Sequence, residues 1–198
     1  YNFEYRFNLK SMRSIQTACL FITILFYSIV TFSQVTLEDI KQRGKLIIGT
    51  TGSQSPYSMV AKDSSLIGLE IDLANNLADA MGVELEFKLM PFEELLSSVE
   101  KGEIDGAMSG ITMTAARNMN VVFIGPYSIT GKSLVTTKSV VKKLNKNREE
   151  ELSKLRFVVL KGSNSLDFVK KKFPSSEFIE VVSHEKGVEM VENKDADA

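Results

Sequence analysis

Two residue types that carry much enzyme chemistry are nearly absent, because the 198 residues include one cysteine, Cys19, and one histidine, His184. Transition-metal sites draw on clusters of these side chains, so we expect no such metal site. A Ser-His-Asp arrangement has a single candidate base and no recognisable nucleophile turn. Glu70 and Asp72 lie two residues apart on a predicted helix and face different directions, which makes a poor acid–base pair. We therefore predict no enzyme activity, no catalytic residue, no metal and no cofactor.

An excess of either charge sign is also lacking. Lys and Arg total 24, Asp and Glu total 25, and the formal net charge is −1. Binding to a polyanion needs a surface of clustered positive charge, so nucleic acid is not an expected partner. Hydrophobic residues at 43% and charged residues at 25% have the balance of a soluble globular protein.

Long hydrophobic runs are missing except near the N-terminus. Arg13 is followed by no charged residue until Glu38, and residues 18–30 between them read ACLFITILFYSIV. Small or polar residues follow at Thr31 and Ser33. A short basic region, an apolar stretch and small residues at the cleavage positions are typical of a secretory signal peptide.

We therefore predict Met12 as the start, a signal peptide over residues 12–33 and an upstream extension over residues 1–11. Such a protein is periplasmic or extracellular. The alternative is an uncleaved membrane anchor, because the uncharged run over residues 14–37 is long enough to span a bilayer. Cys19 lies in the same segment, so the cleaved chain has no cysteine and cysteine usage says nothing about the compartment.

Further along the chain, short apolar runs alternate with amphipathic stretches. The runs that predict strands are residues 45–50, 83–89, 105–108, 121–124, 132–137, 157–160 and 178–182. The stretches that predict helices are residues 68–81, 92–101, a short turn after Thr114, 166–173 and 185–192. The charged residues 142–151 predict a solvated helix or linker. This alternation predicts an α/β fold with a mainly parallel sheet, and its restart near residue 156 predicts a second sheet.

Polar loops follow the predicted strands of the first sheet, at the edge where open parallel sheets bind ligands. They are residues 51–57, the turn around Phe92, and residues 109–117. In the last loop Gly110 lets the backbone approach a ligand closely, and Thr114 caps a helix with free N–H groups. Arg117 offers a two-pronged grip on a carboxylate. An ordinary capped helix with a solvated arginine explains the same pattern, so both interpretations stay open.

A similar loop follows the first strand of the second sheet. Residues 161–165 read KGSNS, and the Ser163 and Ser165 hydroxyls with nearby N–H groups suit the charged end of a ligand. A capped turn that uses Gly and Ser for conformational reasons is the alternative. The spacing of a phosphate-binding loop is absent.

Several blocks of sequence resemble one known family. Residues 68–74, GLEIDLA, resemble the signature of the polar-amino-acid-binding proteins of ABC importers, bacterial extracellular solute-binding family 3. The other matching blocks, in the same order and spacing, are residues 90–92, 102–117, 122–127, 161–165 and 195–198.

The resemblance implies a periplasmic-binding-protein-like type II fold, in which two α/β lobes close around a ligand. Lobe 1 would cover residues 34–132 and an incomplete lobe 2 residues 133–198. Arg117 and Thr112 would hold the α-carboxylate of the ligand. The other positions carried over from the family as ligand contacts are Ser109, Gly110, Phe92, Ser163 and Asn164.

This chain also departs from the family pattern. Thr51 stands where many members have an acidic residue, and Gln54 where many have a stacking aromatic, while Tyr57 keeps the aromatic position after Pro56. These three residues are also expected ligand contacts. The aspartate that binds the ligand ammonium in the family would follow Ala198. The expected ligand is therefore an amino acid or a similar small carboxylate.

The implied function is ligand capture for import, with a membrane ABC permease as partner. Two rival functions use the same fold. One is the ligand-sensing domain of a membrane receptor or kinase, and the other is enzymatic, either a binding module ahead of a murein transglycosylase domain or a dehydratase.

Overall fold

The computed structural model describes residues 36–144 and 148–198. The predicted upstream extension and signal peptide, residues 1–11 and 12–33, lie outside these residues and stay predictions. None of the helices in the two described ranges combines the length and the apolar character needed to cross a bilayer.

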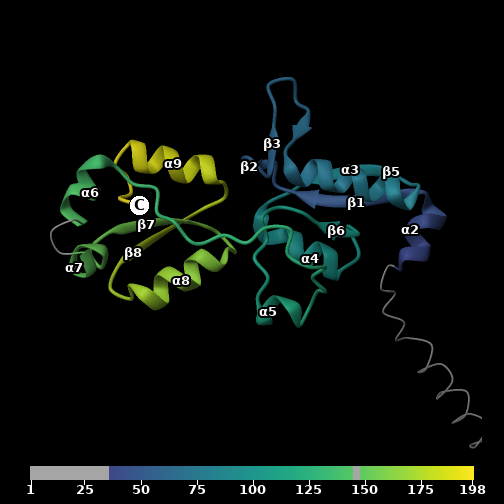
Figure 1. The fold of residues 1–198 in the computed structure, drawn as a ribbon. Helices are drawn as coiled ribbons and strands as arrows, with labels where there is room; N and C mark the ends of the chain where they lie inside the picture. Colours follow the sequence, from purple (N-terminus) through teal and green to yellow (C-terminus); the bar gives the residue numbers. More distant parts are fainter. Residues whose placement is uncertain (1–35, 145–147) are drawn as a thin grey trace, which may run out of the picture. The chain divides into compact units, whose positions relative to one another are not determined.

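The first sheet is parallel and has β1 at its centre (Figure 1). β1 (Lys45–Thr50) pairs along its whole length with β5 (Glu84–Leu89), and β6 (Gly106–Ala107) pairs with its other edge. Most of β1 is buried, as its continuous apolar run predicts. The strands predicted over residues 45–50 and 83–89 are confirmed. The strand predicted over residues 105–108 is present as the shorter β6.

One face of this sheet is covered by α2 (Leu37–Arg43) and α3 (Leu69–Met81). Leu46 and Ile48 of β1 pack there against the buried Ala74 and Ala78 of α3. α3 ends at the left-handed Gly82, whose N–H donates to the last carbonyls of the helix, as predicted.

The other face is covered by η1 (Phe92–Glu94) and α4 (Leu95–Glu100). Gly49 of β1 faces this side, and a Cβ on it would lie 2.5 Å from Ile104 Cδ1 and 3.0 Å from Leu95 Cδ2. Glycine is therefore the residue that lets α4 pack this closely on β1. Helices cover both faces, as the alternating pattern predicts.

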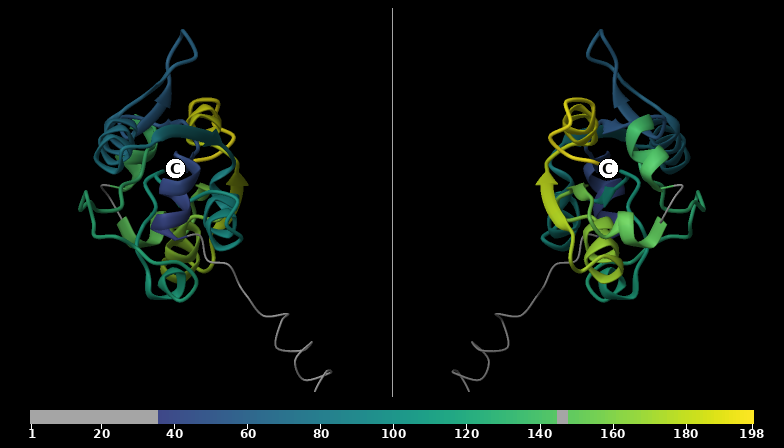
Figure 2. Two further views of the ribbon diagram at one scale, coloured as in Figure 1. Left: turned by 90° about the vertical axis from the view of Figure 1, so that its right-hand side faces the viewer. Right: turned by 90° about the vertical axis from the view of Figure 1, so that its left-hand side faces the viewer.

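A small antiparallel sheet was not predicted. It consists of β2 (Ser53–Gln54), β3 (Ser58–Val60) and β4 (Leu66–Ile67), with β3 in the middle. The loop between β3 and β4 projects away from α3 (Figures 1 and 2). These strands have two or three residues each, which is too short to show a period of two in the sequence.

Two predicted strands are wrong. Residues 121–124 and 132–137 form no strand, because their backbone finds no ladder partner among the described residues. Val122 and Ile124 are 88% and 95% exposed, although an apolar run of this kind is typical of a buried strand. The short helix α5 (Ala115–Asn118) precedes them, and Thr114 caps it as predicted.

The second sheet is formed by β7 (Arg156–Leu160) and β8 (Glu177–Val181), which are parallel. α8 (Asn164–Lys172) and α9 (His184–Glu192) lie on either side of this pair (Figures 1 and 2). All four elements match the predicted ones to within a few residues, so the restart of the pattern near residue 156 is confirmed.

Aromatic stacking forms much of the second core. Phe157, 1% exposed, stacks on Phe173 and Phe178 at centroid distances of 5.4 and 6.4 Å. α6 (Lys138–Leu144) and α7 (Arg148–Leu152) contain most of the predicted charged stretch. Val140 of α6 is part of this core. 

The last residues extend this sheet without forming a regular strand. The Val158 N–H donates to the Ala198 carbonyl, and the Asp197 N–H donates to the Arg156 carbonyl. The strand that the resemblance implies over residues 195–198 is therefore present only as backbone pairing beside β7.

Candidate functional site

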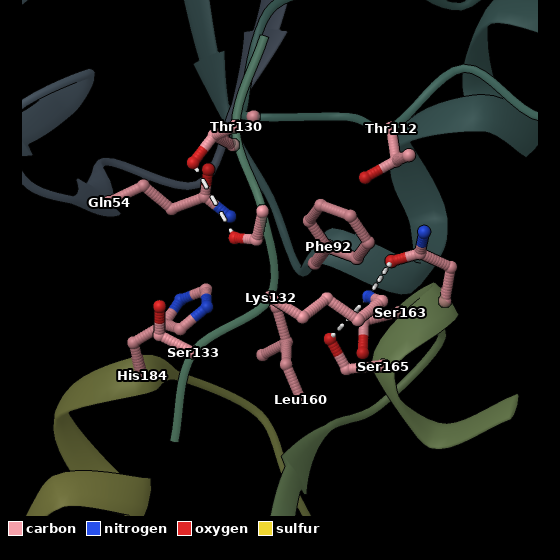
Figure 3. Close-up of a pocket in the computed structure, with 13 residues that line it drawn as sticks. Gln54, Phe92, Thr112, Thr130, Lys132, Ser133, Leu160, Ser163, Ser165 and His184 are labelled. Atoms are coloured by element: carbon pink, nitrogen blue, oxygen red, sulfur yellow. Dashed lines mark hydrogen bonds between the residues drawn. The ribbon is translucent and has the colours of Figure 1, made fainter. Parts of the chain in front are cut away.

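A cavity of about 330 Å³ lies where several strands end (Figure 3). Its lining comes from the loops after β1, β5, β6, β7 and β8 and from the segment before α6. The lining residues are Gln54, Phe92, Gly110, Thr112, Thr130, Gly131, Lys132, Ser133, Leu160, Ser163, Asn164, Ser165 and His184. Parallel strands present their carboxyl ends at one edge of a sheet, so loops far apart in sequence meet there.

The structure brings six of the ten predicted site residues to this cavity. They are Gln54, Phe92, Gly110, Thr112, Ser163 and Asn164. The four that do not line it are Thr51, Tyr57, Ser109 and Arg117. The ligand role of all ten stays a prediction. The four residues that do not line the cavity make contacts within the protein instead.

Ser109 and Thr51 tie two loops together. The Thr51 N–H donates to Ser109 Oγ at 3.2 Å, and the two hydroxyls lie 2.9 Å apart. Ser109 is fully buried. The Tyr57 hydroxyl makes a comparable contact with Ser128 Oγ at 3.0 Å. These side chains hold the loops around the cavity in place.

The buried carboxylate of Glu70 fixes the Gly110 loop. Glu70 Oε1 accepts the Gly110 N–H at 2.6 Å and also the hydroxyl of Tyr127, while Oε2 has no partner within residues 36–144 and 148–198. Burial and the bond to Glu70 raise the pKa of Tyr127, so its hydroxyl stays a donor. Gly110 has φ +57°, and a Cβ on it would lie 2.2 Å from Gln54 Oε1. Only glycine fits this position without displacing Gln54.

Arg117 lies beside the cavity and contacts both sheets' loops. Its guanidinium donates to the carbonyls of Thr112 and Gly162, each at 2.9 Å, and lies 5.8 Å from the centroid of the Phe92 ring. Partial burial lowers the pKa of Arg117, yet the group stays charged at physiological pH. An arginine side chain has five N–H donors. Two donate to these carbonyls, and the other three have no acceptor among the described residues.

The second-sheet side of the cavity is formed by the start of α8. Ser163 is the N-cap residue, but its side chain makes no cap hydrogen bond, and its buried Oγ has no partner among the described residues. Asn164 Oδ1 and Ser165 Oγ accept hydrogen bonds from Lys132 Nζ at 3.0 and 3.2 Å. The loop and Lys132 thus form a hydrogen-bonded polar group at the cavity.

Sequence reasoning missed several lining residues, among them Thr130, Lys132 and His184. Residues 130–133 fall where a strand was predicted to begin, so no loop was expected there. One signal was present, because Lys132 is the only charged residue between Arg117 and Lys138. A lone charge in an apolar run indicates a position with a specific partner.

No group of three or more His, Cys, Asp or Glu residues in the described ranges has a geometry that holds a metal ion. The cavity is therefore analysed through its own side chains and backbone groups.

A family comparison agrees with this arrangement of loops. The model of the bacterial extracellular solute-binding proteins, family 3, matches residues 46–186, which is more than half of the chain. The chain belongs to this family.

Proteins similar to this chain include both a binding protein and an enzyme. The L-cystine-binding protein TcyJ of Escherichia coli (strain K12) is 33% identical over 95 residues, 48% of this chain and 36% of that protein. The cyclohexadienyl dehydratase of Pseudomonas aeruginosa is 28% identical over 127 residues, 64% of this chain and 47% of that protein. The chain thus spans less than half the length of these family 3 relatives.

A solved structure confirms the fold class. An amino acid ABC transporter substrate-binding protein from Streptococcus pneumoniae, bound to L-arginine, superimposes with a TM-score of 0.76 and 27% identity. The match covers 81% of this chain and 68% of that one. The chain therefore has the α/β fold of type II periplasmic binding proteins.

Proposed function

We propose that this family 3 chain is the ligand-binding part of an extracytoplasmic protein that captures an amino acid or a similar small carboxylate. The observation that carries this proposal is the cavity, which joins the carboxyl-end loops of both sheets around one apolar ring and many hydrogen-bond donors. Small-molecule sites in open α/β sheets lie at this edge and combine an apolar wall with a few converging polar groups.

Arg117 is the group we propose for the ligand carboxylate. Its guanidinium lies beside Thr112 and Phe92, two lining residues, and has N–H donors left over for a second acceptor. A carboxylate accepts two parallel N–H bonds from such a group. The Thr112 hydroxyl and the Gly110 backbone would complete the carboxylate end, and Ser163 and Asn164 would contact the ligand from the second sheet.

We propose capture without catalysis. The described lining contains no Asp or Glu, and His184 and Lys132 are its only titratable side chains. Elimination of water in this cavity would therefore have to use one of these two side chains for proton transfer. The supporting comparison is the L-cystine-binding protein, whereas the dehydratase shows that this family also contains an enzyme.

Delivery to a membrane ABC permease is the use we propose for the captured ligand. The names of the relatives include transporter binding proteins, and the family is described as extracellular. We further propose export by the signal peptide over residues 12–33, with residues 34–132 and 133–198 contributing to lobes 1 and 2. N-terminal sequencing of the mature protein should then start near Gln34, and a protein that keeps Met12 would contradict export with cleavage.

The direct test is calorimetric titration of the full-length protein with the common L-amino acids and with their decarboxylated amines. We expect micromolar or tighter binding of at least one amino acid and none of the matching amine. Turnover of a cyclohexadienyl substrate, without stable binding of any amino acid, would favour the enzymatic alternative instead.

A further inference from the structure

Lys132 is the one ammonium group that lines the cavity in the described chain. Its side chain leaves the segment before α6 and reaches under the Phe92 ring toward Ser165 (Figure 3). No other charged residue lies between Arg117 and Lys138, so Lys132 is an isolated charge in its own segment.

The partners of Lys132 are neutral. Its Nζ donates to Asn164 Oδ1 and Ser165 Oγ and lies 5.6 Å from the Phe168 ring centroid. No carboxylate of the described residues pairs with it, whereas Lys161 in the same region pairs with Glu93 at 2.9 Å. Partial burial and the nearby Arg117 charge lower the pKa of Lys132, but a lysine so placed remains protonated near neutral pH.

A ligand in the cavity would change the solvation of the Lys132 ammonium group. Lys132 is exposed without a ligand, so water solvates the charge. A ligand that fills the cavity displaces that water and brings the ammonium into a less polar surrounding. A desolvated cation with neutral partners is costly unless the ligand supplies a negative charge.

We propose that Lys132 is a second anion-binding group of the cavity and selects a ligand with a negative charge in addition to the carboxylate held by Arg117. The ligand class is an acidic amino acid or another small dicarboxylate. This inference rests on the proposed function and adds the charge of the ligand side chain. A cationic side chain, such as that of the L-arginine in the Streptococcus pneumoniae structure, would face like charge at this position.

The rest of the second-sheet loop suits the same anion. Ser165 Oγ accepts from Lys132 Nζ and keeps its own proton to donate. A carboxylate beside these two groups would accept one neutral hydrogen bond and one charged bond. The described lining contains no Asp or Glu carboxylate that could pair with a cationic group of a ligand.

The experiment compares ligands that differ only in charge. Full-length wild-type protein is titrated with L-glutamate against L-glutamine, L-aspartate against L-asparagine, and L-arginine. The variant Lys132→Gln keeps a hydrogen-bonding side chain without the charge. Lys170→Gln is the matched control, because it removes the same charge from an exposed position on α8 that does not line the cavity.

We expect at least one acid to bind about tenfold or more tightly than its amide, and Lys132→Gln to abolish this preference. The variant should weaken binding of the acid more than binding of the amide, since the amide loses one hydrogen bond and the acid also loses an ion pair. Lys170→Gln should keep the wild-type preference. Added salt should weaken binding of the acid more than binding of the amide.

Three results would overturn the inference. In the first, the wild type binds an amide or L-arginine at least as tightly as the acids, or Lys132→Gln keeps the preference. The carboxylate-binding function then survives, because amino acids still bind. In the second, Lys132→Gln weakens acid and amide equally and lowers the melting temperature, which assigns Lys132 a structural role only. In the third, no amino acid binds, and the proposed function fails together with the inference.

Discussion

At the scale of single residues, Glu70 determines where the Gly110 loop lies. It is fully buried, and one carboxylate oxygen accepts both the Gly110 N–H and the Tyr127 hydroxyl. The two bonds connect α3 with two separate loops beside the cavity. The sequence marks Glu70 as part of a signature, but only the structure shows that its role is to hold the backbone.

Replacing Glu70 should therefore destabilise the protein. Glu70→Ala leaves two donors unpaired and opens a space, so we expect the free energy of unfolding to fall by about 3 kcal/mol. Tyr127→Phe removes one of the two donors and should cost about 1.5 kcal/mol. Urea unfolding of the full-length variants measures both values. A loss below about 1 kcal/mol for Glu70→Ala would show that the carboxylate does not hold the loop.

Lys132 and His184 show why part of the site escaped prediction. Each lies in a segment whose local pattern indicates a strand or a helix start and not a ligand-binding loop. They become site residues only because three segments meet after folding. In contrast, Gly110 and Thr112 belong to a polar loop between two predicted elements, and such loops are visible in the sequence.

At the scale of elements, Arg156 and Asp197 attach the last residues to β7. Arg156 Nε donates to Asp197 Oδ2 at 3.1 Å, and the Arg156 N–H donates to the same oxygen at 3.0 Å. These bonds from Arg156 lower the pKa of Asp197 below its ordinary value of 3.8. The folded state therefore favours the ionised carboxylate.

The sign of the pH effect follows from this shift. The stabilising contribution is complete above pH 3.8 and is lost as the pH falls through the lower pKa of the folded state. Asp197→Asn should lower the free energy of unfolding by about 0.5–1 kcal/mol at pH 7, because the pair is partly exposed. The difference from wild type should vanish near about pH 2 in a pH series of urea unfolding. Asp195→Asn, with the same charge change, is the control, and an equal effect there would contradict the pairing.

The period of apolar residues predicted most elements correctly where each segment packs against a neighbour. β1, α3, β5, β7 and α9 all follow patterns that burial imposes on the sequence. Residues 121–124 and 132–137 have similar patterns, but a strand also needs a hydrogen-bonded partner, which the pattern does not encode. The antiparallel sheet of β2, β3 and β4 was missed for the opposite reason. Its strands pair through backbone hydrogen bonds, but their sequence has no apolar alternation that would predict them.

At the scale of the whole molecule, the described loops of the two sheets converge on one cavity, and Arg117 contacts both sides. It donates to Thr112 on one side and to Gly162 on the other. A ligand carboxylate would add a charged acceptor to this set. If the two sides close around the ligand and exclude water, the loss of either charge would leave the other one buried and unpaired.

The measurement that tests the account most directly is calorimetric titration of Arg117→Ala and Arg117→Lys in the full-length protein with its best amino-acid ligand. Arg117→Ala should weaken binding by about 2–5 kcal/mol. Arg117→Lys should also weaken it, because an ammonium does not reproduce the planar two-pronged contact. Unchanged affinity in Arg117→Ala would contradict the carboxylate grip, and equally tight binding of ligands without a carboxylate would contradict the proposed ligand class as well.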